Sequence, residues 1–157
     1  MSTSRRQTFA IVGGGLAAAE AAKTLRADGF DGRLVIIAAE PHLPHERPPL
    51  SKAYLRGEVG VDALLAEPAA FYDERGIEVL TGRRAVGLDL TGHRLTLDDD
   101  TSLRFDRLLL ATGGRAVRPR FDGIERPWVH LLRTIADADA LRDAAGAAAP
   151  APSAKEE

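Results

Sequence analysis

Cysteine is absent from this 157-residue sequence. Without cysteine, the chain has no thiolate ligands for a zinc ion or an iron–sulfur cluster. It also has no redox-active dithiol, so any electrons that it handles cannot pass through a disulfide of its own. The missing residue type therefore excludes cysteine-ligated metal sites and dithiol exchange.

Long apolar runs and a strong net charge are missing as well. No run approaches the roughly 20 apolar residues of a membrane span, and residues 1–7 are too polar for a secretion signal. The net charge is −2, and Lys and Arg form no basic stripe that would indicate nucleic acid. With 45% hydrophobic and 28% charged residues, the composition is that of a soluble globular protein. We expect a cytoplasmic protein with neither a membrane nor a nucleic-acid partner.

A glycine-rich turn near the amino terminus is the most informative motif. A short apolar run precedes three glycines, and an alanine-rich segment follows to about Ala27, which predicts a strand, a tight turn and a helix. Gly13 can adopt the positive φ that such a turn needs, and Gly15 leaves room for a pyrophosphate against the backbone. The first amides of the helix, at Leu16 and Ala17, carry partial positive charge and can bind an anion. This spacing is typical of dinucleotide-binding turns.

An acidic residue supports this interpretation. Glu40 follows a second apolar run, 34–38, and lies about 20 residues beyond the glycine motif, where a Rossmann-like fold places its ribose-binding acid. Ala18 is the small residue that lets helix and strand pack closely. A surface glutamate after a strand is the alternative, but the preceding glycine motif favours ribose binding.

A proline-rich segment, PHLPHERPPLSKAYL, follows Glu40. We expect an extended stretch over its prolines and a short helix after Ser51, which is a plausible N-cap. Arg47 and Lys52 are close enough in sequence to converge on an anionic or electron-rich ligand, and Arg suits a phosphate through its planar fork. Two solvated surface charges are the alternative interpretation.

Two patterns resemble metal sites without predicting one. His42 and His45 form an H-x-x-H pair, but a metal needs a third ligand and a rigid geometry, which a proline-rich loop does not offer. The acidic run 98–100 lacks the spaced ligands and the terminal glutamate of a calcium loop. We expect no metal.

The later segments predict the remaining strands. Residues 76–82 match a third parallel strand, and the alternation over 85–105 predicts a small antiparallel meander. The apolar run 107–110 predicts a strand buried on both faces of the parallel sheet. Three small residues then permit close ligand approach at the carboxyl edge of the sheet: Ala111, Thr112 and Gly113.

Three motifs together resemble a known family: RPPLSKAYL at 47–55, ATG at 111–113 and VHLLRT at 129–134. They are similar to the ferredoxin/rubredoxin reductases, FAD-dependent NAD(P)H reductases related to putidaredoxin reductase and apoptosis-inducing factor. The resemblance covers about 9–143 and implies an α/β, Rossmann-like FAD-binding fold with a parallel sheet and the meander. It also implies electron transfer from NAD(P)H through FAD to a ferredoxin or rubredoxin-like iron–sulfur protein.

The resemblance implies roles for individual residues. Lys52 takes the place of the catalytic lysine beside the flavin ring, and Arg47 and Arg133 help to hold FAD. A cation there favours the reduced, more negative ring. Ala85 stands where the family's backbone touches the adenine and where valine is more usual.

The chain also departs from the family. We expect an FAD-binding domain over 1–143 and a disordered Ala/Pro tail over 144–157. Relatives continue into an NAD-binding domain and then return to complete the sheet. This sequence has no second glycine motif, so no NAD(P)H site is expected in it and apolar surface should be exposed.

Two other functions therefore stay open. One is a non-catalytic module that binds FAD or ADP without NAD(P)H turnover. The other, an NAD-only Rossmann dehydrogenase, has no use for a flavin-facing Lys52. The redox partner, the choice of NADH or NADPH, and the oligomeric state are not predicted.

Overall fold

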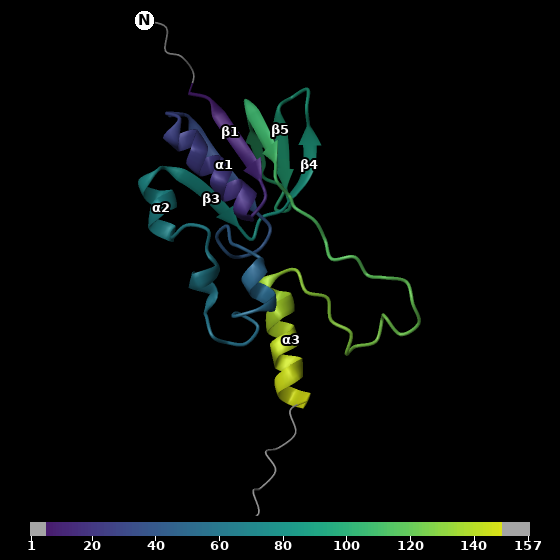
Figure 1. Ribbon diagram of the computed structural model, residues 1–157. Helices are drawn as coiled ribbons and strands as arrows, with labels where there is room; N and C mark the ends of the chain where they lie inside the picture. Colours follow the sequence, from purple (N-terminus) through teal and green to yellow (C-terminus); the bar gives the residue numbers. More distant parts are fainter. Residues whose placement is uncertain (1–5, 149–157) are drawn as a thin grey trace, which may run out of the picture. The chain divides into compact units, whose positions relative to one another are not determined.

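The computed structural model describes residues 6–148 (Figure 1). The chain divides into two compact units, which are described separately. The first unit contains the residues up to Glu46 together with Asp62–Gly114. The second unit contains Arg47–Val61 and the residues from Arg115 onward.

A parallel four-stranded sheet forms the centre of the first unit, in the order β3-β2-β1-β7. Its strands are β1 (Thr8–Val12), β2 (Arg33–Ala38), β3 (Ile77–Thr81) and β7 (Arg107–Leu110). All four were predicted as strands of a parallel sheet, and the α/β fold class is confirmed. Crossovers between parallel strands bring the carboxyl ends of all four strands to one edge, where such sheets bind ligands.

Two helices accompany one face of this sheet: α1 (Leu16–Ala27) and α2 (Ala69–Glu74) (Figure 1). Ala18 and Ala22 of α1 are fully buried in a cluster with Ile11 and Ile36, to which α2 contributes Tyr72. Alanine has the highest helix propensity, and its small side chain lets the helix approach the strands closely. The predicted role of Ala18 in close packing is confirmed.

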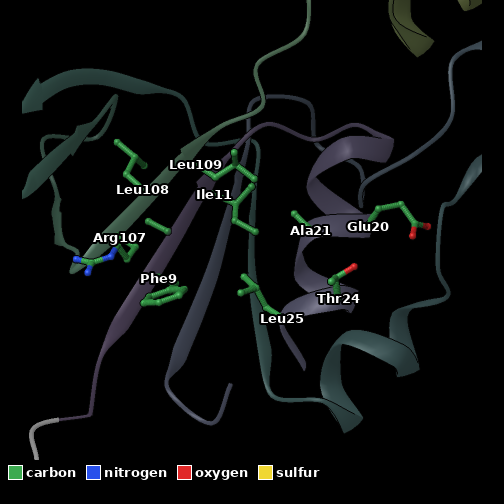
Figure 2. Close-up of a pocket in the computed structure, with 10 residues that line it drawn as sticks. Phe9, Ile11, Glu20, Ala21, Thr24, Leu25, Arg107, Leu108 and Leu109 are labelled. Carbon is green, nitrogen blue, oxygen red and sulfur yellow. The ribbon is translucent and has the colours of Figure 1, made fainter. Parts of the chain in front are cut away.

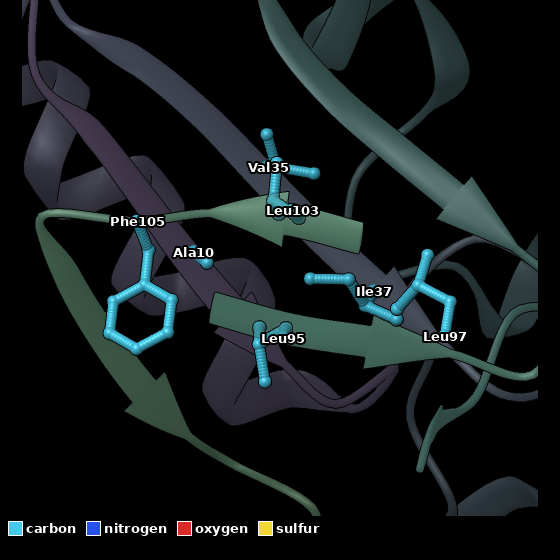
Figure 3. Close-up of a cluster of buried hydrophobic side chains, with 7 residues drawn as sticks. All are labelled: Ala10, Val35, Ile37, Leu95, Leu97, Leu103 and Phe105. Atoms are coloured by element: carbon cyan, nitrogen blue, oxygen red, sulfur yellow. The ribbon is translucent and has the colours of Figure 1, made fainter. Parts of the chain in front are cut away.

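The meander packs on the sheet through a second cluster. It consists of β4 (Ala85–Asp89), β5 (Arg94–Leu97) and β6 (Ser102–Arg104), paired antiparallel as predicted. Alternate apolar residues of the meander face the sheet, because successive side chains of a strand point to opposite sides. Figure 3 shows them against the sheet residues of the same cluster: Leu95, Leu97, Leu103 and Phe105 against Ala10, Val35 and Ile37.

The strand β7 differs from the prediction. It pairs with β1 alone and is the edge of the sheet within the described chain, so Leu109 and Leu110 keep exposed fractions of 42% and 60%. The prediction of a strand buried on both faces is therefore wrong. An apolar groove of about 490 Å³ runs between this edge and α1, with Phe9, Ala21 and Leu25 in its wall (Figure 2). Exposed apolar surface was expected, and the groove and the edge strand supply it.

The second unit contains the helix α3 (Ile135–Ala148) and a 3-10 turn, η1 (Pro48–Ser51), while another 3-10 turn, η2, spans Val61–Leu64. The turn η1 begins at Pro48 and Pro49 and ends at Ser51, so the expected extended stretch is wrong at these two prolines, and the N-cap role of Ser51 is wrong as well. Proline suits the first positions of a helical turn because its φ is already fixed there and its missing amide is not needed.

The helix α3 extends into the segment that was expected to be the tail. Residues 144–148, expected to start a disordered tail, continue the helix because alanine favours it. The rest of that expected tail, 149–157, lies outside the described residues. Within residues 6–148, no helix combines the length and the apolar character that crossing a membrane requires.

Candidate functional site

The turn after β1 is fixed by a neighbouring strand as well as by its own conformation. Gly13 has a φ of 148°, as predicted, and its amide donates to the Ile37 carbonyl (2.9 Å). A Cβ at Gly13 would overlap the backbone carbonyl of Ala111, which follows β7. Glycine is therefore required here because three segments of the first unit meet at its backbone.

Open space lies in front of the first turn of α1. Gly15 is the N-cap residue of the helix, and no side chain caps this end. A Cβ at Gly15 would meet no atom within 4 Å. The first turn contains no acidic residue, so the partial positive charge of its amides is not offset there. An anionic group fits in this space next to the helix amides.

Glu40 lies just beyond the end of β2, on the same edge of the sheet as the glycine turn. The Gly82 amide donates to the backbone carbonyl of Glu40 (2.9 Å), so this stretch is tied to the end of β3. The Glu40 side chain has an exposed fraction of 21%, and its Oε2 lies 3.6 Å from Nε2 of His45. The carboxylate is thus held near the sheet but remains accessible.

The other predicted residues of the first unit occupy two places. Ala111 donates its amide to the Val12 carbonyl (2.8 Å), and Thr112 and Gly113 are exposed after it, with a φ of 67° at Gly113. Ala85 opens β4 and packs against the cluster of the meander. The small residues at 111–113 therefore adjoin the glycine turn, and Ala85 contributes to the core.

The remaining predicted residues lie in the second unit. The Nη1 of Arg47 donates to the Arg133 carbonyl (2.6 Å), so these two arginines are brought together. Lys52 follows η1 and is exposed. The proposed phosphate and ribose residues and the three cations thus belong to different units.

A capping box places Arg133 at the start of α3. The Asp137 carboxylate accepts the amides of Arg133 (3.0 Å) and Thr134 (2.8 Å), and the Asp137 amide donates to Oγ1 of Thr134 (3.1 Å). Burial opposes ionisation of Asp137, but these hydrogen bonds from Thr134 and Arg133, with the charge of Arg47, lower the pKa of the carboxyl.

Sequence reasoning missed the buried position of His45. The H-x-x-H pair was interpreted as a loop without rigid geometry, but the His45 side chain is fully enclosed. The residue before it, Pro44, is buried as well, and no periodic pattern in this segment signals that burial. Among residues 6–148, no group of three His, Asp or Glu side chains is arranged to hold a metal ion.

Comparison with known proteins places these features in a family. The model of the pyridine nucleotide-disulphide oxidoreductases matches residues 7–149. The chain belongs to this family. The predicted resemblance to its ferredoxin reductases is confirmed by the relatives that follow.

Two curated relatives and one solved structure illustrate the similarity within the family. Rhodocoxin reductase of Rhodococcus erythropolis is 39% identical over 85% of this chain and 31% of its own length. The ferredoxin–NAD(+) reductase subunit of a benzene 1,2-dioxygenase system in Pseudomonas putida is 42% identical over 85% of this chain and 32% of its own. Putidaredoxin reductase, solved in a covalent complex with putidaredoxin, superposes with a TM-score of 0.78 at 34% identity.

The coverage of that structure is 89% of this chain and 34% of the other. The chain thus spans about a third of the length of these family members.

Proposed function

We propose that this chain forms the FAD-binding part of a ferredoxin reductase. The observation that carries the proposal is the open space at Gly15, in front of an uncapped helix end and on the same sheet edge as Glu40. A dinucleotide needs a phosphate site and a ribose acceptor on one edge of a parallel sheet, and in this proposal the space at Gly15 and the Glu40 carboxylate serve as these. One relative named above is a ferredoxin–NAD(+) reductase subunit, and the other is a rhodocoxin reductase.

Each proposed site residue of the first unit has a defined role in binding the cofactor. The amides of Leu16 and Ala17 donate to the pyrophosphate, and Gly15 admits it because no side chain fills the space. Glu40 accepts hydrogen bonds from the adenosine ribose hydroxyls. Thr112 and Gly113, exposed at the end of β7, offer backbone close to the same edge.

The residues of the second unit would serve the other end of the cofactor. Arg47 and Arg133 supply cationic groups for binding, and the exposed Lys52 supplies a cation for the flavin ring. When bound, FAD supplies two-electron acceptance from NAD(P)H and one-electron release to an iron–sulfur protein. The roles of these three residues, and that of Ala85 beside the adenine, rest on the family resemblance.

For the whole reductase, the electron donor and acceptor are proposed from the relatives, because this chain spans about a third of their length. The names of the relatives support a nicotinamide nucleotide as the electron donor and a ferredoxin as the acceptor, and one relative was solved joined to putidaredoxin. A rubredoxin-like acceptor rests on the family resemblance. We propose a cytoplasmic location. We also propose that residues 1–143 constitute the FAD-binding domain.

Two titrations test the proposal. FAD added to the purified chain should lose fluorescence with a saturable midpoint, because the isoalloxazine ring is quenched on binding. Absence of saturation at millimolar FAD would contradict the proposal. NADH oxidation with ferricyanide as acceptor then distinguishes a reductase from a non-catalytic module. Turnover by this chain excludes the module, and FAD binding without turnover supports it.

A further inference from the structure

The ring of His45 is enclosed next to the glycine turn. The His45 side chain has an exposed fraction of 0%. Apart from the two buried tyrosines, it is the one residue with a polar or charged side chain that is buried within residues 6–148. A polar ring in such a place costs free energy unless its nitrogens are paired. The position of each nitrogen therefore indicates what the ring does.

The backbone of His45 is attached to the phosphate turn. Its amide donates to the Gly14 carbonyl (3.3 Å), and the residue forms single bridges to Gly15 on one side and to Leu65 on the other. The next amide, that of Glu46, donates to the Leu64 carbonyl (2.8 Å). The residue is thus fixed between the glycine turn and the end of η2.

The two ring nitrogens have different surroundings. Nδ1 lies 3.0 Å from the Leu43 carbonyl oxygen, and since a carbonyl can only accept, Nδ1 carries a proton and donates it. Nε2 is buried without a hydrogen-bond partner, and Oε2 of Glu40 lies 3.6 Å away. The unpartnered nitrogen is therefore aimed at the carboxylate that we assign to the ribose.

We propose that His45 is a positioning residue that orients the Glu40 carboxylate and links it to the phosphate turn. This inference rests on the proposed function, because it concerns the same nucleotide site. In the doubly protonated ring, Nδ1 donates to Leu43 while Nε2 donates to Oε2 of Glu40 after a small approach. That contact sets the orientation of the carboxylate that we assign to the ribose.

The other groups around the ring do not compete for Nε2. His42 packs edge-on against it, with ring centroids 6.3 Å apart. The backbone neighbours Gly14, Gly15 and Leu65 bring no titratable side chains. Glu40 is thus the carboxylate paired with this ring.

Two amide substitutions separate the two contacts of the ring. His45→Gln places a donor near the position of Nε2 and preserves the contact with Glu40, whereas His45→Asn reaches Leu43 but presents no group to Glu40. We expect the FAD dissociation constant of His45→Gln to stay within about threefold of the wild type. That of His45→Asn should rise about tenfold, equivalent to about 1.4 kcal/mol. In a Glu40→Gln background, His45→Asn should add little further loss.

A spectroscopic measurement tests the contact without any ligand. The ¹⁵N resonance of Nε2 in labelled histidine should shift when Glu40 is changed to Gln, and that of Nδ1 should change less. Thermal unfolding of each variant shows whether it folds. An Nε2 resonance that ignores Glu40→Gln overturns the inference.

The titrations distinguish the two proposals. Equal FAD affinity in His45→Gln, His45→Asn and the wild type overturns the role of His45 and leaves the proposed function standing. A wild-type chain that binds no FAD, with the Nε2 response intact, contradicts the proposed function and the ribose role, and leaves the His45–Glu40 pair as a structural contact.

Discussion

The side chains that stabilise the first unit are mostly apolar, whereas those of the second unit are to a larger extent polar. In the first unit, two clusters of buried aliphatic and aromatic residues cover both faces of the sheet. In the second, Tyr54 donates to Asp139 (2.7 Å), Arg47 to the Arg133 carbonyl, and the capping box holds the start of α3. The residues proposed to bind phosphate and ribose are therefore positioned by a unit that apolar packing stabilises. The proposed flavin-facing cations are positioned by a unit in which hydrogen bonds contribute more.

Truncation of a core side chain in the first unit should have the largest effect. Ile36 is fully buried between β1 and β3, and Ile36→Ala should lower the free energy of unfolding by about 2–5 kcal/mol through lost burial and the cavity left behind. Leu110→Ala is the matched control, because the same kind of truncation at an exposed edge should cost less than about 0.5 kcal/mol. Urea unfolding followed by circular dichroism measures both, and equal losses would contradict this description of β7.

A smaller effect is expected at the cap of α3 in the second unit. Asp137→Asn should reduce the protection of the Arg133 and Thr134 amides in native-state hydrogen exchange by about 1 kcal/mol. Asp143→Asn, an exposed position on the same helix, should leave this protection unchanged. A loss of the same size in both variants would show that the general charge of the helix matters and the box does not.

The same cap makes the second unit sensitive to acid. The pKa of Asp137 is lowered in the folded chain, so its contribution is present above the ordinary value of about 4 and disappears as the pH falls through the lowered value. Protection of the Thr134 amide should therefore decline below about pH 4 in the wild type and stay flat in Asp137→Asn. A wild-type profile as flat as that of the variant would be inconsistent with the box.

Replacing tyrosine by phenylalanine should change stability in opposite directions in the two units. Tyr54→Phe removes the hydroxyl that donates to Asp139 and should destabilise the second unit by about 1 kcal/mol. The Tyr72 hydroxyl is buried without a hydrogen-bond partner among the described residues, and burial raises the pKa of Tyr72 to about 12. Tyr72→Phe should thus be neutral or stabilising by up to about 1 kcal/mol. Hydrogen exchange in each unit measures the pair, and destabilisation by Tyr72→Phe would reveal a partner for that hydroxyl.

Sequence motifs and the alternation of apolar residues made much of the first unit predictable. The glycine motif predicted β1, the turn and α1, and alternation over 85–105 predicted the meander, because both depend on residues near one another in sequence. The burial of β7 was not predictable from its leucines. An apolar run indicates a preference for burial. Whether the strand is buried depends on how many strands lie beside it, and β7 pairs with β1 alone within the described residues.

The candidate site shows the same limit. Gly13 was predicted for its φ, but its contact with Ala111 joins residues far apart in sequence. The enclosure of His45 depends on the glycine turn and the Leu64–Leu65 segment together. Prolines in 41–49 suggested an extended stretch, although two of them instead begin η1.

The most direct test of the central claim is an FAD titration of Gly15→Val. Gly15 has extended backbone angles (φ −114°, ψ −175°) that any residue adopts, and an added Cβ would meet no atom within 4 Å, so the variant should keep its fold. The added side chain would stand where we place the pyrophosphate, and we expect FAD affinity to fall at least about tenfold. Gly146→Val, which also adds a side chain into open space, should bind FAD like the wild type. Unchanged affinity in a folded Gly15→Val variant would contradict the assignment of the phosphate site.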